Sequence, residues 1–158
     1  MSLAYDTDFY AWTQEQADAL ARRSANELDW DNLREELTLL GSEVELGLTS
    51  ALEQVIHHWL KWLYQERRRS RSWVLSIQEH RRRVQKRLVL SPSLRPILPD
   101  IFLEAYQTAR LTAARETDSP LESFPETPPF DLEFVMEAPI AWEAPAPQRR
   151  SRTRKTKG

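Results

Sequence analysis

The feature that most constrains the fold of this chain is a series of apolar residues at helical spacing. The series continues for about nine turns of helix. These residues recur every three or four positions between Trp30 and Trp62, so in an α-helix they share one side. This face comprises Trp30, Leu33, Leu37, Leu40, Val44, Leu48, Ala51 or Leu52, Val55, Trp59 and Trp62 or Leu63. Asp29 precedes the face and suits an N-cap, because its carboxylate can accept a free N–H of the first turn. We predict a helix over about 30–65 that is either bent near Gly41 or broken there into two.

The rest of the chain also shows helical spacing, and no convincing stretch alternates apolar and polar residues as a half-buried strand does. Each helix is bounded by capping residues or by prolines, which cannot continue a helix. The other predicted helices cover about 6–22, capped by Asp6 or Thr7; about 70–90, ending before Pro92; about 99–117; and a short stretch after Asp131.

These helices together predict an all-α fold, an up-and-down bundle of four to five helices with an extended C-terminal segment. One helical domain accounts for residues 5–137. The remaining residues, 138–158, have no apolar periodicity and are rich in proline and basic side chains. We therefore expect them to form a disordered basic tail.

Charge is distributed very unevenly along the chain, although the net charge is only −2. Residues 1–58 carry a net charge of −9, residues 65–87 carry +7, and the last sixteen residues carry +5. Blocks of opposite charge can dock on each other or on separate partners. We expect the basic block to lie beside the acidic block within one bundle.

Several classes of protein are excluded by composition. The chain has no cysteine, which excludes a disulfide scaffold, a cysteine zinc site and a thiol nucleophile. Its three glycines form no phosphate-binding loop. No apolar run approaches the roughly 18–20 residues that span a bilayer. The N-terminus lacks the basic and apolar regions of a signal peptide, so a cytoplasmic protein is expected.

Ordered motifs along the chain resemble one bacterial family. They are Tyr5-x-x-Asp8-Phe9-Tyr10-x-Trp12-x-x-x-Gln16, Leu28-Asp29-Trp30-x-Asn32-Leu33-x-Glu35-Glu36-x-x-x-Leu40-Gly41, His58-x-x-Lys61-Trp62, Arg69-Ser70-x-Ser72-Trp73 with Ile77 and Arg81, Pro92-Ser93-Leu94, and Phe124-Pro125. Together they are similar to the domain of unknown function 29 family, notable for its paralogues in cyanobacteria, over about residues 5–137. The resemblance implies an all-helical fold and no established biochemistry, and it leaves out the basic tail.

One candidate site combines a carboxylate, an imidazole and a guanidinium. Spacing places Glu36, His58 and Arg81 on the inward faces of their helices. Such a cluster could move protons or hold an anion. Alternatively, it is an ion-paired cluster that fixes the register of three helices, and we favour this structural interpretation. In either case we expect Arg81 to be buried and paired with an acid, first of all Glu36.

A metal site is a weaker candidate. Glu53 and His57 are four residues apart and could both reach one metal ion from one helix. The sequence offers no third and fourth ligand at a recognisable spacing. The other residues considered are Glu36, Glu43, His58 and His80. We predict neither a metal nor a cofactor.

Basic residues form the third candidate, a nucleic-acid surface. Arginine matches phosphate oxygens, and Trp73 and His80 could stack on bases. The candidates are Arg67, Arg68, Arg69, Arg71, Arg82, Arg83 and Arg87, together with Arg149, Arg150, Arg152, Arg154, Lys155 and Lys157 of the tail. Against this interpretation, the pI is near 6.0 and no known nucleic-acid-binding motif is present.

These observations favour a small helical module that binds another macromolecule, with a protein as the expected partner and no membrane association. One alternative is nucleic-acid binding through residues 67–87 and 149–157. A second is an enzyme built on Glu36, His58 and Arg81. Because no nucleophile or complete catalytic set stands out, we lean against an enzyme.

Overall fold

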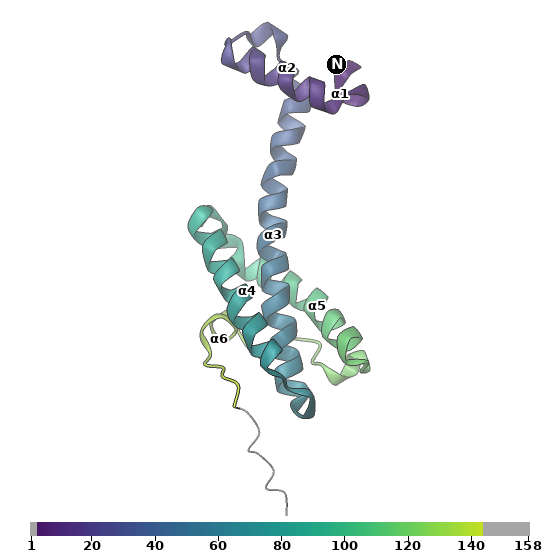
Figure 1. The fold of residues 1–158 in the computed structure, drawn as a ribbon, viewed down its shortest axis with the longest axis vertical. Helices are drawn as coiled ribbons and strands as arrows, with labels where there is room; N and C mark the ends of the chain where they lie inside the picture. Colours follow the sequence, from purple (N-terminus) through teal and green to yellow (C-terminus); the bar gives the residue numbers. More distant parts are fainter. Residues whose placement is uncertain (1–2, 144–158) are drawn as a thin grey trace, which may run out of the picture.

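Helix α3 (Trp30–Tyr64) is the axis of the molecule and runs for 35 residues without a break (Figure 1). The structure, a computed structural model, describes residues 3–143, and within that range it contains helices and no strand. The all-α fold is thereby confirmed. The helices are α1 (Leu3–Thr7), α2 (Phe9–Ala21), η1 (Ala25–Glu27), α3 (Trp30–Tyr64), η2 (Glu66–Arg68), α4 (Arg71–Leu90), η3 (Pro92–Ile97), α5 (Leu98–Thr117), η4 (Leu121–Ser123) and α6 (Leu132–Glu137).

Aspartate side chains cap three of these helices. Asp29 Oδ1 accepts from Asn32 N and begins α3, and Asp131 Oδ1 accepts from Phe134 N and begins α6, both as predicted. The first helix differs from the prediction. Asp8 Oδ1 accepts from Ala11 N over 2.9 Å, so the chain forms two helices, α1 and α2, where one was expected.

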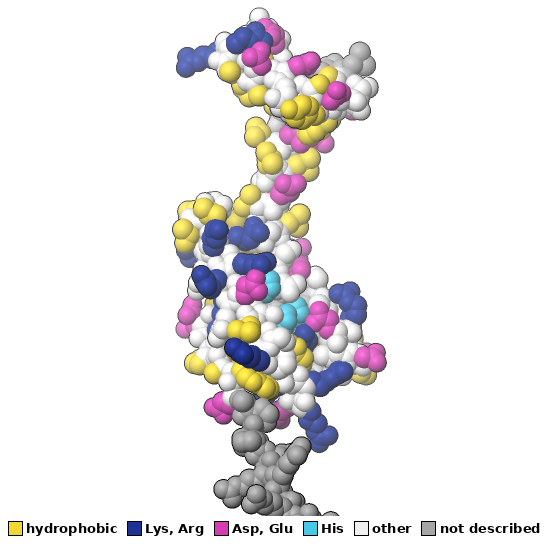
Figure 2. Space-filling view, viewed as in Figure 1, with side chains coloured by type: hydrophobic (Ala, Val, Ile, Leu, Met, Phe, Trp, Pro, Cys, Tyr) yellow, Lys and Arg dark blue, Asp and Glu magenta, His cyan; other side chains and the backbone are white. Residues whose placement is uncertain are grey.

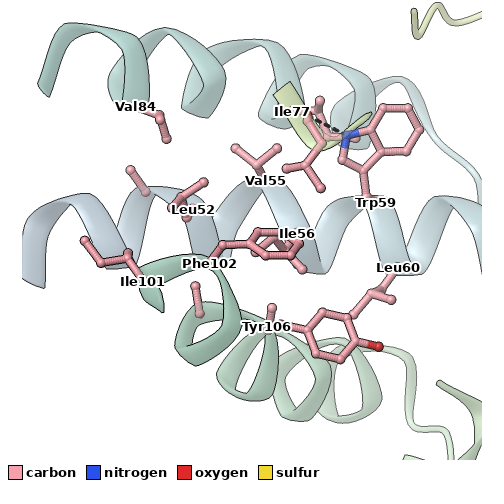
Figure 3. Close-up of a cluster of buried hydrophobic side chains, with 14 of the residues drawn as sticks. Leu52, Val55, Ile56, Trp59, Leu60, Ile77, Val84, Ile101, Phe102 and Tyr106 are labelled. Atoms are coloured by element: carbon pink, nitrogen blue, oxygen red, sulfur yellow. Dashed lines mark hydrogen bonds between the residues drawn. The ribbon is translucent and has the colours of Figure 1, made fainter. Parts of the chain in front are cut away.

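The hydrophobic core lies between the C-terminal half of α3 and the two helices that follow it, α4 and α5. Figure 3 shows Leu52, Ile56 and Leu60 of α3 between apolar side chains of these two helices. Tyr106 of α5 and Ile77 of α4 are fully buried there. Residues four apart on each helix fill this core, which is the packing that their sequence spacing predicts.

The N-terminal half of α3 extends beyond this core, because α3 has 35 residues while α4 and α5 have 20 each. The difference of 15 residues corresponds to about 22 Å of helix. Helices α1 and α2 pack at the far end of α3, away from α4 and α5 (Figure 1). Three long helices therefore form the bundle. We call residues 3–47, which comprise α1, α2, η1 and the N-terminal half of α3, the arm.

The C-terminal segment wraps around the bundle. Phe124 is buried, and the carbonyl oxygens of Phe124 and Pro125 accept hydrogen bonds from Arg110 and Tyr106 of α5. Helix α6 then covers one side of α3. Ala138 and Ile140 still pack against the core. The predicted basic tail lies mostly outside the described residues. No helix in the described part of the chain is long and apolar enough to cross a bilayer.

Candidate functional site

The tip of the arm is held together by hydrogen bonds that converge on Asp29. The Trp12 indole donates to Asp29 Oδ2 over 3.3 Å, and the backbone N–H of Asp29 donates to Gln16 Oε1 over 2.7 Å. Asn32 also donates its side-chain amide to Asp29 Oδ2 over 2.8 Å. Trp12 and Gln16 are buried by this arrangement. Asp29 thus both begins α3 and fixes α2 against it.

A second contact joins α1 to α3. The Tyr5 hydroxyl donates to Glu36 Oε1 over 2.6 Å, and its ring makes edge-on contacts with Phe9 and Trp12. The hydrogen bond to Glu36 is the main reason that the pKa of Tyr5 rises to about 12. The arm therefore has its own small core, built mainly from aromatic rings and one carboxylate.

Beside this small core, α2 and α3 form an apolar groove of about 390 Å³. Leu33, Leu37 and Leu40 of α3 line one wall, and Phe9 and Leu20 of α2 line the other. From the groove toward the bundle, every residue of α3 between 37 and 46 is exposed, although this stretch contains large apolar side chains. Figure 2 shows apolar side chains along this narrow stem of α3. Those in the stem are Leu37, Leu39, Leu40, Val44 and Leu46.

The arm is also strongly acidic. Residues 3–47 hold eleven acids and three bases, whereas α4 holds six bases and one acid. Within residues 3–143, no ion pair joins an acid of residues 1–58 to a base of residues 65–87. The expectation that the two blocks dock on each other inside one bundle is therefore wrong for a single copy. The physical reason is the unbroken α3, which carries most of the acids beyond the reach of α4.

The predicted cluster of Glu36, His58 and Arg81 does not form. Glu36 and His58 are 22 residues apart on one continuous helix, about 33 Å along its axis. Glu36 bonds to Tyr5, while His58 Nδ1 lies 2.7 Å from the carbonyl oxygen of Gln54. Arg81 is half-buried and bonds to backbone carbonyls of α6 and Ala138. The structure therefore offers no site at which these three side chains could act together.

The structure brings together a different polar cluster, within the bundle. The Lys61 ammonium is buried, donates to Glu116 Oε2 over 2.6 Å and lies 4.7 Å from the ring centroid of Trp73. His57 Nε2 is 3.3 Å from the same carboxylate oxygen, and the His58 ring is beside that of His57. The sequence feature that could have indicated this cluster is Lys61, a lysine on the apolar face of the helix one turn after His57. The acid could not be predicted, because it comes from α5, 55 residues later.

Burial determines the protonation of both histidines. Loss of solvent lowers the pKa of His57, and it lowers the pKa of His58 to about 4. Both imidazoles are therefore neutral at neutral pH. The polar contacts of Lys61 and Glu116 join α3 to α5, so the cluster stabilises the bundle.

The metal candidates are scattered over the molecule. His57 Nδ1 lies 3.1 Å from the carbonyl oxygen of Glu53, whose carboxylate forms a hydrogen bond with Thr108. Glu43 is on the exposed stem of the arm, and His80 is on α4. Among residues 3–143, no group of three or more His, Cys, Asp or Glu side chains could hold a metal ion.

Several of the predicted nucleic-acid residues also make contacts within the fold. Arg68 donates to the carbonyl oxygen of Thr117, and Arg69 donates to that of Trp62 over 2.8 Å and also stacks on the Trp62 ring. Arg83 pairs with Glu79 over 2.5 Å. All of the candidates between 67 and 87 except Arg69 are exposed, namely Arg67, Arg68, Arg71, Arg82, Arg83 and Arg87. The tail candidates Arg149, Arg150, Arg152, Arg154, Lys155 and Lys157 lie outside the described residues.

A family model, described as domain of unknown function DUF29, matches residues 4–139. The chain belongs to the DUF29 family. The match runs from α1 to just beyond α6, so the DUF29 domain includes the arm as well as the bundle. No curated protein and no solved structure matches the chain.

The motifs that resemble the DUF29 family hold structural positions in this fold. Tyr5 with Glu36, and Trp12 and Gln16 with Asp29, fix the tip of the arm. Lys61 of the bundle pairs with Glu116, and Arg69 packs on Trp62. The motif residues Leu40 and Gly41 lie instead in the exposed stem of the arm, where contacts within the fold do not explain them.

Proposed function

We propose that this protein is a helical interaction module whose arm binds another polypeptide chain. The observation that carries the proposal is the exposed stem, residues 37–46, in which every residue is accessible and half are large and apolar. A soluble monomer rarely leaves a large contiguous apolar surface uncovered.

Two physical arguments support a protein partner. Most of the stability of a helix in a protein comes from packing of its apolar face, so a partner that packs along the exposed stem would stabilise it. Burial of the apolar side chains would contribute roughly 25 cal/mol for each Å² removed from water. The groove between α2 and α3 is lined mainly by apolar side chains, as are grooves in which proteins bind an amphipathic helix.

Site-specific photo-crosslinking tests this proposal. A photoreactive amino acid replaces Leu40 in the stem or, as the matched control, Leu103 on the outer face of α5. The two side chains are similarly exposed, at 57% and 55%. In cells that naturally produce the protein, we expect protein adducts at position 40 and none at position 103. Equal yields at both positions, or no adduct at either, would contradict the proposal.

A second candidate is nucleic-acid binding by the basic residues of α4. Its support is a shallow depression on α4 that Arg82, Arg83 and Lys86 line together. These side chains could contact phosphates without any change in the fold. The acidic arm disfavours this candidate, because it would repel a nucleic acid.

A further inference from the structure

Gly41 lies in the middle of the exposed stem and has no evident role within one copy of the chain. An added Cβ at this position would meet nothing within 4 Å. The other helical glycine is different, since an added Cβ at Gly47 would collide with the guanidinium of Arg87. Glycine weakens the interior of a helix relative to alanine. A glycine at Gly41 is therefore unexplained unless something outside this copy approaches the backbone there.

The residues around Gly41 form a seam suited to another helix. Trp30, Leu37, Gly41, Val44 and Leu48 follow one another at spacings of seven, four, three and four residues. With the interval of seven counted as two steps, the average spacing is 3.6 residues, so these side chains share one face of α3 along which a second helix can pack. Trp30, Leu37 and Val44 are exposed, while Leu48 is already buried in the core. The seam is thus continuous with the bundle core, and the glycine marks its centre.

The end of the bundle nearest the arm has the complementary chemistry. Arg87 lies against Gly47, so the C-terminal end of α4 is beside the point where the arm begins. Val89 and Leu90 are exposed apolar side chains at that end, and Lys86 and Arg95 are exposed bases. An acidic, apolar arm and a basic, apolar bundle end are therefore present on every copy, but within one copy they are not paired.

We infer that a second copy of this chain covers the arm, with the two α3 helices antiparallel and crossing near Gly41. This inference rests on the proposed function and names the partner. A two-fold axis at Gly41 places residue 34 of one copy beside residue 48 of the other, so each acidic arm tip lies against the basic bundle end of the second copy. A parallel pair would instead place acid against acid over the whole arm. The antiparallel dimer accounts for the glycine, the seam and the charge blocks together.

Cysteine crosslinking tests this geometry cleanly, because the chain contains no cysteine of its own. Single substitutions Gly41→Cys, Leu37→Cys and Leu103→Cys are introduced into the full chain, which is purified alone and exposed to a mild oxidant. A disulfide requires Cα atoms within about 7 Å, which the crossing point satisfies for position 41. In the antiparallel pair the two copies of position 37 are about 12 Å apart along the axis. We expect a disulfide dimer for Gly41→Cys only.

Each other result overturns the inference. A crosslink at both 37 and 41 would show a parallel pair, and equal crosslinking at 103 would show random collision. Sedimentation equilibrium measures the mass of the unsubstituted chain in solution, and so tests for a dimer that does not depend on an introduced cysteine. We expect twice the chain mass, reverting to the chain mass in Leu40→Glu but not in Leu103→Glu. A monomeric unsubstituted chain that still gives photo-adducts at position 40 with another protein would refute the second copy and leave the proposed function standing.

Discussion

Arg81 Nε donates a hydrogen bond of 2.8 Å to the carbonyl oxygen of Val135, and this bond ties α4 to α6. The same guanidinium donates to the carbonyl oxygen of Ala138 over 2.8 Å and lies 5.5 Å from the ring centroid of Trp59. The last carbonyls of a helix have no partners within the helix and carry partial negative charge. The Trp59 indole donates to the same Val135 oxygen over 3.1 Å, so Arg81 and Trp59 together hold the end of α6 against the bundle.

We predict that Arg81→Met lowers the free energy of unfolding by about 2–3 kcal/mol, because carbonyls that bond to a charged donor lose it. Arg82→Met is the matched control, since Arg82 is next in sequence but exposed, and it should have little effect. Urea denaturation with equal m-values in all variants measures the difference. Equal stability of the two variants would show that Arg81 contributes no more than a surface residue.

The Lys61–Glu116 pair predicts unequal effects for its two partners. Glu116→Ala leaves the buried Lys61 ammonium without a carboxylate, whereas Lys61→Met removes the charge and can keep the contact with Trp73. Because Glu116 is partly exposed, we expect a loss of about 2 kcal/mol for Glu116→Ala and a smaller loss for Lys61→Met. Thermal unfolding of both variants decides the order, and a larger loss for Lys61→Met would contradict the assignment of Lys61 as the buried partner.

The sequence predicts some of these features and not others, for physical reasons. Helix positions and the Asp29 cap follow from local spacing and capping chemistry, which act within a few residues. The inward position of Arg81 also follows from spacing, but its acceptors are backbone carbonyls, which no residue type marks. Whether α3 bends at Gly41 depends on contacts in three dimensions. Because α3 is unbroken, Glu36 lies far from His58 and the arm is exposed.

The two buried histidines predict a loss of stability in mild acid. Burial, and then the charge of His57, hold the pKa of His58 at about 4 in the folded protein, below the usual value of about 6.5 in the unfolded chain. The unfolded chain therefore binds more protons between these values, and the free energy of unfolding falls as the pH drops below about 6.5. For His58 we expect a decrease of up to about 1 kcal/mol between about pH 7 and pH 5.5, and His57 acts in the same direction. His58→Phe should make this decrease smaller, and an unchanged pH profile in that variant would contradict the assignment.

The nucleic-acid alternative predicts a salt dependence. If the six bases of residues 149–157 bind phosphates, the full chain should bind a random DNA duplex with a log–log salt slope approaching about −5. Replacement of these six bases by glutamine in the full chain should then abolish binding, while replacement of Arg82 and Lys86 tests α4 separately. Fluorescence anisotropy across a salt series measures both. Absence of binding by the unsubstituted chain at low salt would eliminate this alternative.

Amide hydrogen exchange of the stem tests the central claim, that the arm is covered by a second copy, most directly. A helical segment with few buried contacts opens more readily than a packed one, so its amides exchange faster, whereas a packed seam protects them. Exchange is followed by mass spectrometry in the full chain at low and high protein concentration. We predict that amides of residues 37–46 become protected as the concentration rises, while those of the core residues 52–60 are protected throughout. Rapid exchange of residues 37–46 at every concentration, with the core still protected, would contradict the claim.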